Sequence, residues 1–90
     1  MITIWKVKIK HWERDTFIEQ YNLFSWAEGF LGCQFYTVWE NELIAVESWK
    51  SQEMHKKFAQ SLPEEKMWEL FSLLEGQPEM FECELAELIK

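Results

Sequence analysis

The chain has 90 residues, of which 48% are apolar and 17% aromatic, and its 16 acidic side chains against nine Lys and Arg give a net charge of −7. A chain of this length forms a single domain, residues 1–90, and its negative charge argues against binding to a nucleic-acid backbone. No apolar run approaches the roughly 18 residues of a membrane span, and no signal-peptide pattern follows the start, so we expect a cytosolic protein without membrane contact.

Hydrophobic periodicity and turn residues predict four strands and two helical regions. Runs rich in β-branched and aromatic residues indicate strands, whereas apolar residues three and four positions apart indicate helices. In chain order the predicted elements are a strand over 1–10, a helix over 13–26, strands over 31–39 and 43–49 joined by a polar turn at 40–42, a helical region over 52–74 capped by Ser51 and interrupted at Pro63, and a strand over 79–88.

The order β-α-β-β-α-β predicts the ferredoxin-like α+β fold, an antiparallel sheet with two helices on one face. Residues 33–39 and 43–46 are apolar at both strand parities, whereas a sheet face open to water alternates with polar residues. A second chain packed on that face explains the pattern better than a covering chain terminus does. We therefore expect a homodimer that associates through its sheet faces.

Glu47 is the residue where the fold raises a question of function. A carboxylate in the apolar part of a strand is costly to bury unless it is paired or used. Because strand side chains alternate, Glu47 shares a face with Ala45 and Trp49, and His55 lies on the sheet-facing stripe of the next helix. A carboxylate and an imidazole across a small apolar cavity can move a proton. Alternatively, Glu47 points outward or pairs with a lysine of the first strand.

The other distinctive side chains have a structural interpretation first. Cys33 and Cys83, in separate strands, predict small core residues rather than a disulfide or a zinc site, and we expect neither metal nor cofactor. Tyr21 could donate a hydrogen bond to a ligand, although buried tyrosines usually find partners. Most aromatic residues at helical spacing predict core packing: Phe17, Tyr21, Phe24, Phe58 and Phe71.

The predicted element order, the turn Gly29-Phe30 into the second strand, and Glu47-x-Trp49-x-Ser51 leading into a helix with His55 and Phe58 resemble the antibiotic biosynthesis monooxygenase family of dimeric α/β barrels. The resemblance spans nearly the whole chain. This family includes cofactor-independent monooxygenases acting on phenols or quinols, haem-degrading enzymes and signal-molecule isomerases.

The resemblance implies that Trp49 lines a substrate cavity. Some monooxygenases of the family have an asparagine four residues earlier, where this chain has Ala45. Some have a tyrosine six residues later, where this chain has His55, which keeps a proton-transferring group. Trp68 occupies the position that matches the axial histidine of the haem-degrading members, and the first strand lacks their asparagine, so the resemblance does not favour haem degradation.

Two functions remain open at this point. In the first, the chain is a cofactor-independent monooxygenase for a small aromatic phenol- or quinol-type substrate, in which His55 and Glu47 move the proton. The residues expected to line the substrate site are Trp49, Ala45, Phe58, Tyr21 and Trp68. In the second, the chain is a non-catalytic dimeric module that binds a small apolar molecule or only assembles, a reading favoured by the missing polar group at Ala45.

Overall fold

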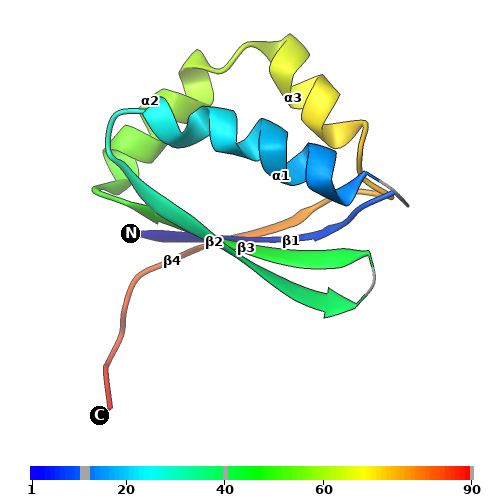
Figure 1. Cartoon of the computed structure of the whole chain (residues 1–90). Helices are drawn as coiled ribbons and strands as arrows, with labels where there is room; N and C mark the ends of the chain where they lie inside the picture. Colours follow the sequence, from blue (N-terminus) through cyan, green and yellow to red (C-terminus); the bar gives the residue numbers. More distant parts are fainter. Residues whose placement is uncertain (11–12, 40, 90) are drawn as a thin grey trace.

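A computed structural model describes the whole chain except residues 11–12, 40 and 90. The elements of this described part are β1 (Ile2–Lys8), α1 (Arg14–Asn22), the 3₁₀ helix η1 (Leu23–Trp26), β2 (Phe30–Trp39), β3 (Glu42–Trp49), α2 (Gln52–Ser61), α3 (Glu64–Phe71) and β4 (Glu79–Cys83). The strands form one antiparallel sheet in the order β2-β3-β1-β4, and the helices lie together over one of its faces (Figure 1). The predicted ferredoxin-like α+β fold is confirmed.

The boundaries of the first three strands differ from the prediction by one or two residues, and three larger differences concern the helices and the last strand. The first helix narrows to a 3₁₀ turn after Asn22, and the second helical region is divided into α2 and α3. The division of the second helical region follows from Pro63, because the residue before a proline avoids the helical conformation. Leu62, which precedes Pro63, is extended, at φ −71° and ψ 125°. The last strand ends at Cys83 rather than residue 88, because Cys83 pairs with Ile2, the first residue of β1, and no partner strand continues beyond it among the described residues.

The connections around α2 position the residues that follow β3. Ser51 caps α2 as predicted, since its Oγ accepts a hydrogen bond of 3.2 Å from the Met54 N–H. Gly29, in the turn before β2, has φ +84°, and a Cβ there would lie 2.5 Å from the Met54 sulfur. Its carbonyl accepts a 2.7 Å hydrogen bond from the Lys50 N–H. Glycine at this turn therefore lets the chain pack closely against the start of α2.

The two faces of the sheet differ in what covers them. Residues of alternate parity in β1 and β3 point toward the helices, where the main buried cluster comprises Val7, Ile9, Phe17, Tyr21, Leu43, Ala45, Leu70 and Leu74. The opposite face carries Ile4 and Val46, which pair across β1 and β3, with Phe81 of β4 beside them. Phe81 and Tyr36 are exposed on this face. The centre of the second face is thus apolar, and Lys6, Glu79 and Gln34 lie around it on the same face.

Two predictions fall on positions of which the structure gives no description. The side chain of Phe24, placed in the apolar stripe of the first helix, and Glu40 of the predicted turn both lie outside the described residues. Among the described helices, none combines the length and the apolar character needed to cross a membrane.

Candidate active site

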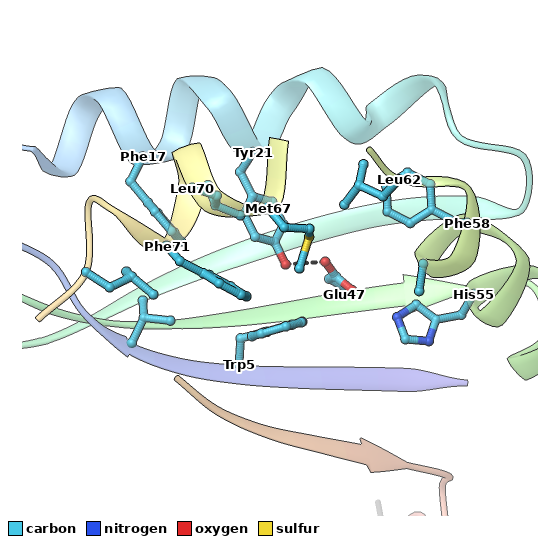
Figure 2. A pocket seen from close by; sticks show the side chains of 13 residues that line it. Trp5, Phe17, Tyr21, Glu47, His55, Phe58, Leu62, Met67, Leu70 and Phe71 are labelled. Atoms are coloured by element: carbon cyan, nitrogen blue, oxygen red, sulfur yellow. Dashed lines mark hydrogen bonds between the residues drawn. The ribbon is translucent and has the colours of Figure 1, made fainter. Parts of the chain in front are cut away.

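An apolar cavity of about 80 Å³ lies between the sheet and the helices (Figure 2). A cavity of roughly 150 Å³ holds a benzene molecule, so this one is matched to a single ring only after small side-chain movements. Its walls come from β1, β3 and all three α-helices, and they include the polar side chains of Tyr21, Glu47 and His55. Acid–base groups therefore face a space whose wall is otherwise mostly apolar.

Glu47 enters the cavity because its parity in β3 turns it toward the helices. It is only 5% exposed, and both carboxylate oxygens accept hydrogen bonds. Tyr21 Oη donates to Oε2, and Trp49 Nε1 donates to Oε1 at 3.0 Å. The alternative of a lysine partner is wrong, since Lys6 pairs instead with Glu42 at 3.3 Å. Within the described part of the chain, Glu47 is a buried carboxylate held by two neutral donors.

The side chain of Tyr21 extends from α1 to Glu47 of β3 through the core. Its ring packs edge-on against Phe35 of β2, with the centroids 5.2 Å apart, and at 5.7 Å from Phe17 one helical turn earlier. Burial, followed by the negative charge of Glu47, raises the pKa of Tyr21 far above its ordinary value. Burial therefore favours the protonated phenol, which donates its hydrogen bond to Glu47.

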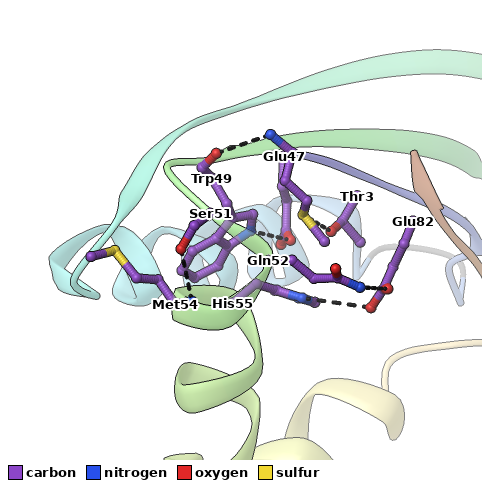
Figure 3. A network of polar contacts seen from close by, with 9 residues as sticks. Thr3, Glu47, Trp49, Ser51, Gln52, Met54, His55 and Glu82 are labelled. Atoms are coloured by element: carbon purple, nitrogen blue, oxygen red, sulfur yellow. Dashed lines mark hydrogen bonds and ion pairs between the residues drawn. The ribbon is translucent and has the colours of Figure 1, made fainter. Parts of the chain in front are cut away.

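His55 is positioned by the Ser51 cap, one turn into α2, and is 8% exposed. Its ring lies 5.0 Å from the ring of Trp49. Its Nδ1 is buried without a hydrogen bond in the described structure and lies 3.8 Å from Oε1 of Glu82 in β4 (Figure 3). Gln52 holds that carboxylate through a 3.1 Å hydrogen bond to Oε2. The imidazole of His55 therefore lies between the carboxylate of Glu82 and the cavity.

Trp49 links the two acid–base groups. It donates to Glu47, packs against the tilted ring of His55, and lies 5.3 Å from the ring of Phe58, which itself lines the cavity. Trp49 is buried behind these residues and is not part of the cavity wall, in contrast to the lining role that the resemblance implied. Ala45 is a fully buried core residue and is also not part of the cavity wall.

Trp68, expected among the substrate-binding residues, does not reach the cavity. It is 65% exposed on the outer side of α3, where its Nε1 donates a 3.3 Å hydrogen bond to Glu64 one turn earlier. Met67, Leu70 and Phe71 face inward instead. These three residues form the centre of the inward stripe of α3, and Trp68 lies at its edge.

Trp5 is a cavity residue with a polar atom that the sequence interpretation missed. It pairs with Ala45 across β1 and β3 and lies on the cavity side of β1 (Figure 2). In the sequence it is one of several strand-forming residues, and the only available signal was its shared parity with Val7.

A larger surface groove adjoins the cavity, with a volume of about 450 Å³, and the two share Leu62 and Leu70 as wall residues.

Cys33 lies opposite Glu47 in the β2–β3 ladder, and both cysteines are free. In the described part of the chain, no group of three or more His, Cys, Asp and Glu side chains could hold a metal ion. Burial, followed by the charge of Glu47, raises the pKa of Cys33 from 9.0 to about 12. The folded state therefore holds this proton more tightly than the unfolded state does.

We expect the free energy of unfolding to fall as the pH rises from about 9 toward 12, because the thiol ionises first in the unfolded chain. Tyr21, whose pKa is also raised, acts in the same direction. Urea denaturation at several pH values measures the slope. Cys33→Ala should flatten part of this slope. Identical slopes for the wild type and Cys33→Ala would contradict the proposed burial of a neutral thiol.

The fold is shared with several solved structures at low sequence identity. A putative antibiotic biosynthesis monooxygenase from Chloroflexus aurantiacus is 20% identical, with a TM-score of 0.72 over 99% of this chain and 97% of that one. SnoaB from Streptomyces nogalater, a cofactor-independent oxygenase, is 12% identical, with a TM-score of 0.73 over 94% and 93%. MhuD, with two manganese protoporphyrin IX molecules bound per active site, is 15% identical, with a TM-score of 0.65 over 99% and 97%.

Further similar structures also bear the name antibiotic biosynthesis monooxygenase, so the resemblance seen in the sequence is confirmed at the level of the fold. No protein-family model matches the chain, and no curated protein matches it.

Proposed function

We propose that this chain, which has the fold of structures named antibiotic biosynthesis monooxygenases, is a cofactor-independent monooxygenase for a small aromatic phenol or quinol. The observation that carries the proposal is the apolar cavity into which Glu47 and His55 both project, each in contact with Trp49. The shared fold of SnoaB, a cofactor-independent oxygenase, supports this type of reaction.

In the proposed reaction His55 accepts the phenolic proton, because its imidazole, unlike the carboxylate of Glu47, is not already held by two hydrogen bonds. Glu82, 3.8 Å from Nδ1, is placed to attract the resulting imidazolium. The electron-rich phenolate then reduces molecular oxygen, and oxygen forms a bond to a ring carbon that carries hydrogen. Loss of water gives a quinone. One oxygen atom enters the product and one leaves as water, so the substrate supplies all four electrons.

In this proposal Glu47 is a positioning residue. Its two hydrogen bonds fix Tyr21 and Trp49, and Trp49 in turn packs against His55 and Phe58. The apolar remainder of the cavity would keep water away from the reduced oxygen species. Leu62 and Leu70, which stand between the cavity and the outer groove, would limit the size of the ring that enters.

A resident haem does not fit these residues. Trp68 occupies the position that the resemblance matches to an axial histidine, and its indole is exposed and carries no nitrogen lone pair suited to iron. The cavity of about 80 Å³ is also far smaller than a porphyrin requires. We therefore derive no step through haem.

Oxygen consumption with electron-rich phenols tests the proposed reaction directly. With 2,6-dimethoxyphenol we expect uptake above the uncatalysed rate and formation of the corresponding quinone. Under oxygen-18 gas, one labelled atom should appear in the quinone and the other in water. Phenols that bind in the cavity but never raise oxygen uptake would end the proposal of catalysis.

We further propose that the chain is a homodimer packed through its sheet faces. The support is the apolar face formed by Ile4, Val46 and Phe81, which has no partner within the described chain. Large exposed apolar faces of this kind typically mark an interface. The two free cysteines fit a reducing compartment such as the cytoplasm.

Val46→Lys should convert the dimer into a monomer of 11.0 kDa, because it places a charge at the centre of the proposed interface. Sedimentation measures the mass, and the matched control is Trp68→Lys, which adds the same charge on the outer side of α3. We expect the control to remain dimeric. A wild-type chain that sediments as a monomer at working concentrations would contradict the dimer.

A non-catalytic binding module is the second candidate, and one observation favours it. Both oxygens of Glu47 are already engaged by Tyr21 and Trp49, as in a carboxylate with a purely structural role. Ala45 also provides no polar group. This candidate predicts that phenols bind without oxygen uptake and that removal of the His55 imidazole changes neither result.

A further inference from the structure

The indole N–H of Trp5 has no partner in the described structure. Trp5 Nε1 is a buried side-chain atom that forms no hydrogen bond, although the side chain lines the cavity. Figure 2 shows the ring below Glu47 and Met67, on the sheet side of the space. A buried donor without an acceptor costs about 1–3 kcal/mol, so folded proteins rarely leave one unused. No described residue supplies an acceptor for Trp5, and a ligand in the cavity that its side chain lines can supply one.

Glu47 is the anionic acceptor of the cavity wall, and its bonds go elsewhere. Tyr21 Oη and Trp49 Nε1 occupy its two oxygens, one donor on each. The other neighbours of Trp5 in the wall are mostly carbon, including Val7, Met67 and Phe71. A water molecule needs two to four polar partners to be held firmly, and this part of the wall offers few of them. An oxygen atom on an otherwise apolar ligand suits the site better.

We infer that Trp5 is a ligand-binding residue whose indole N–H donates to an oxygen of an aromatic ligand and so selects oxygen-bearing rings over hydrocarbons. The inference rests on the proposed function in that the ligand occupies the same cavity. It does not require that any reaction follows. An indole nitrogen can only donate, so the group it selects is an acceptor such as a phenol, phenolate or quinone oxygen.

This assignment gives Trp5 a role in the proposed chemistry as well. When His55 removes the phenolic proton, negative charge develops on the substrate oxygen. A hydrogen bond to an ionised acceptor is roughly twice as strong as one between neutral groups. Trp5 would therefore bind the phenolate more tightly than the phenol, without itself exchanging a proton.

Anaerobic binding of phenol and toluene, two rings of nearly equal size, tests the inference without any turnover. Calorimetric titration of the wild type and Trp5→Phe gives four affinities. We expect Trp5→Phe to weaken phenol binding about fivefold, the equivalent of one ordinary hydrogen bond, and to change toluene binding less than twofold. Trp68→Phe, which alters an exposed indole outside the cavity, should change neither. Equal changes for phenol and toluene, or no loss for phenol, would overturn the inference.

A second measurement uses the wild-type protein and is independent of how the variant folds. In nitrogen-15 NMR spectra, the assigned indole N–H resonance of Trp5 should move downfield when phenol binds and move little with toluene. Equal movement with both ligands would refute the hydrogen bond. Loss of phenol preference in Trp5→Phe together with no oxygen uptake by the wild type would leave this inference standing and end the proposed oxygenase activity alone.

Discussion

Glu47→Ala is expected to lower the free energy of unfolding by about 2–4 kcal/mol. The reason is that Tyr21 Oη and Trp49 Nε1 lose their acceptor at the same time and remain buried. Each unsatisfied buried donor costs about 1–3 kcal/mol, and the removal of a buried charge offsets part of the sum. Urea denaturation with a two-state analysis measures the change.

Tyr21→Phe separates the two hydrogen bonds of Glu47. It removes one donor, keeps the ring packed on Phe35, and should cost about 1–2 kcal/mol. The variant that combines Tyr21→Phe with Glu47→Ala should lose less free energy of unfolding than the sum of the two single variants, by about 1.5 kcal/mol or more. The reason is that each single variant already removes the same hydrogen bond. Strict additivity would mean that Tyr21 and Glu47 are not coupled and that the polar anchor of the cavity lies elsewhere.

Local patterns predicted much of this site because they act over a few residues. Alternation along β3 placed Glu47 under the helices, and the Ser51 cap placed His55 in the first turn of α2. The contact between Tyr21 and Glu47 joins residues 26 positions apart. Such a contact depends on how α1 crosses the sheet, which hydrophobic periodicity in α1 does not specify.

The incorrect predictions have two different physical origins. The resemblance to a family is the only ground for placing Trp68 in the cavity, whereas the stripe that faces inward comprises Met67, Leu70 and Phe71. The last strand was extended to residue 88 from alternation alone, whereas a strand needs a neighbour to pair with and β1 provides none beyond Ile2. Pairing is a tertiary property, and the place of Trp5 in the cavity wall depends on the same register.

His55→Ala is expected to lower the rate of oxygen uptake at least a hundredfold while the dimer persists. General-base catalysis contributes roughly 10²–10⁴ to a rate, and the described cavity holds no second imidazole to replace His55. Lys56→Ala, which alters the exposed neighbour on α2, is the matched control and should keep the full rate. Sedimentation of each variant confirms that the assembly is unchanged.

Added imidazole separates a chemical role of His55 from a structural one. The alanine variant leaves a space beside Trp49, where free imidazole can enter and accept the phenolic proton. We therefore expect imidazole to restore a measurable part of the rate in His55→Ala and to leave His55→Phe inactive, because the phenyl ring fills that space. Rescue absent from both variants, or a His55→Ala enzyme that already works at the wild-type rate, would show that His55 does not carry the proton. In either case the cavity would be a binding site whose polar groups serve to hold its shape.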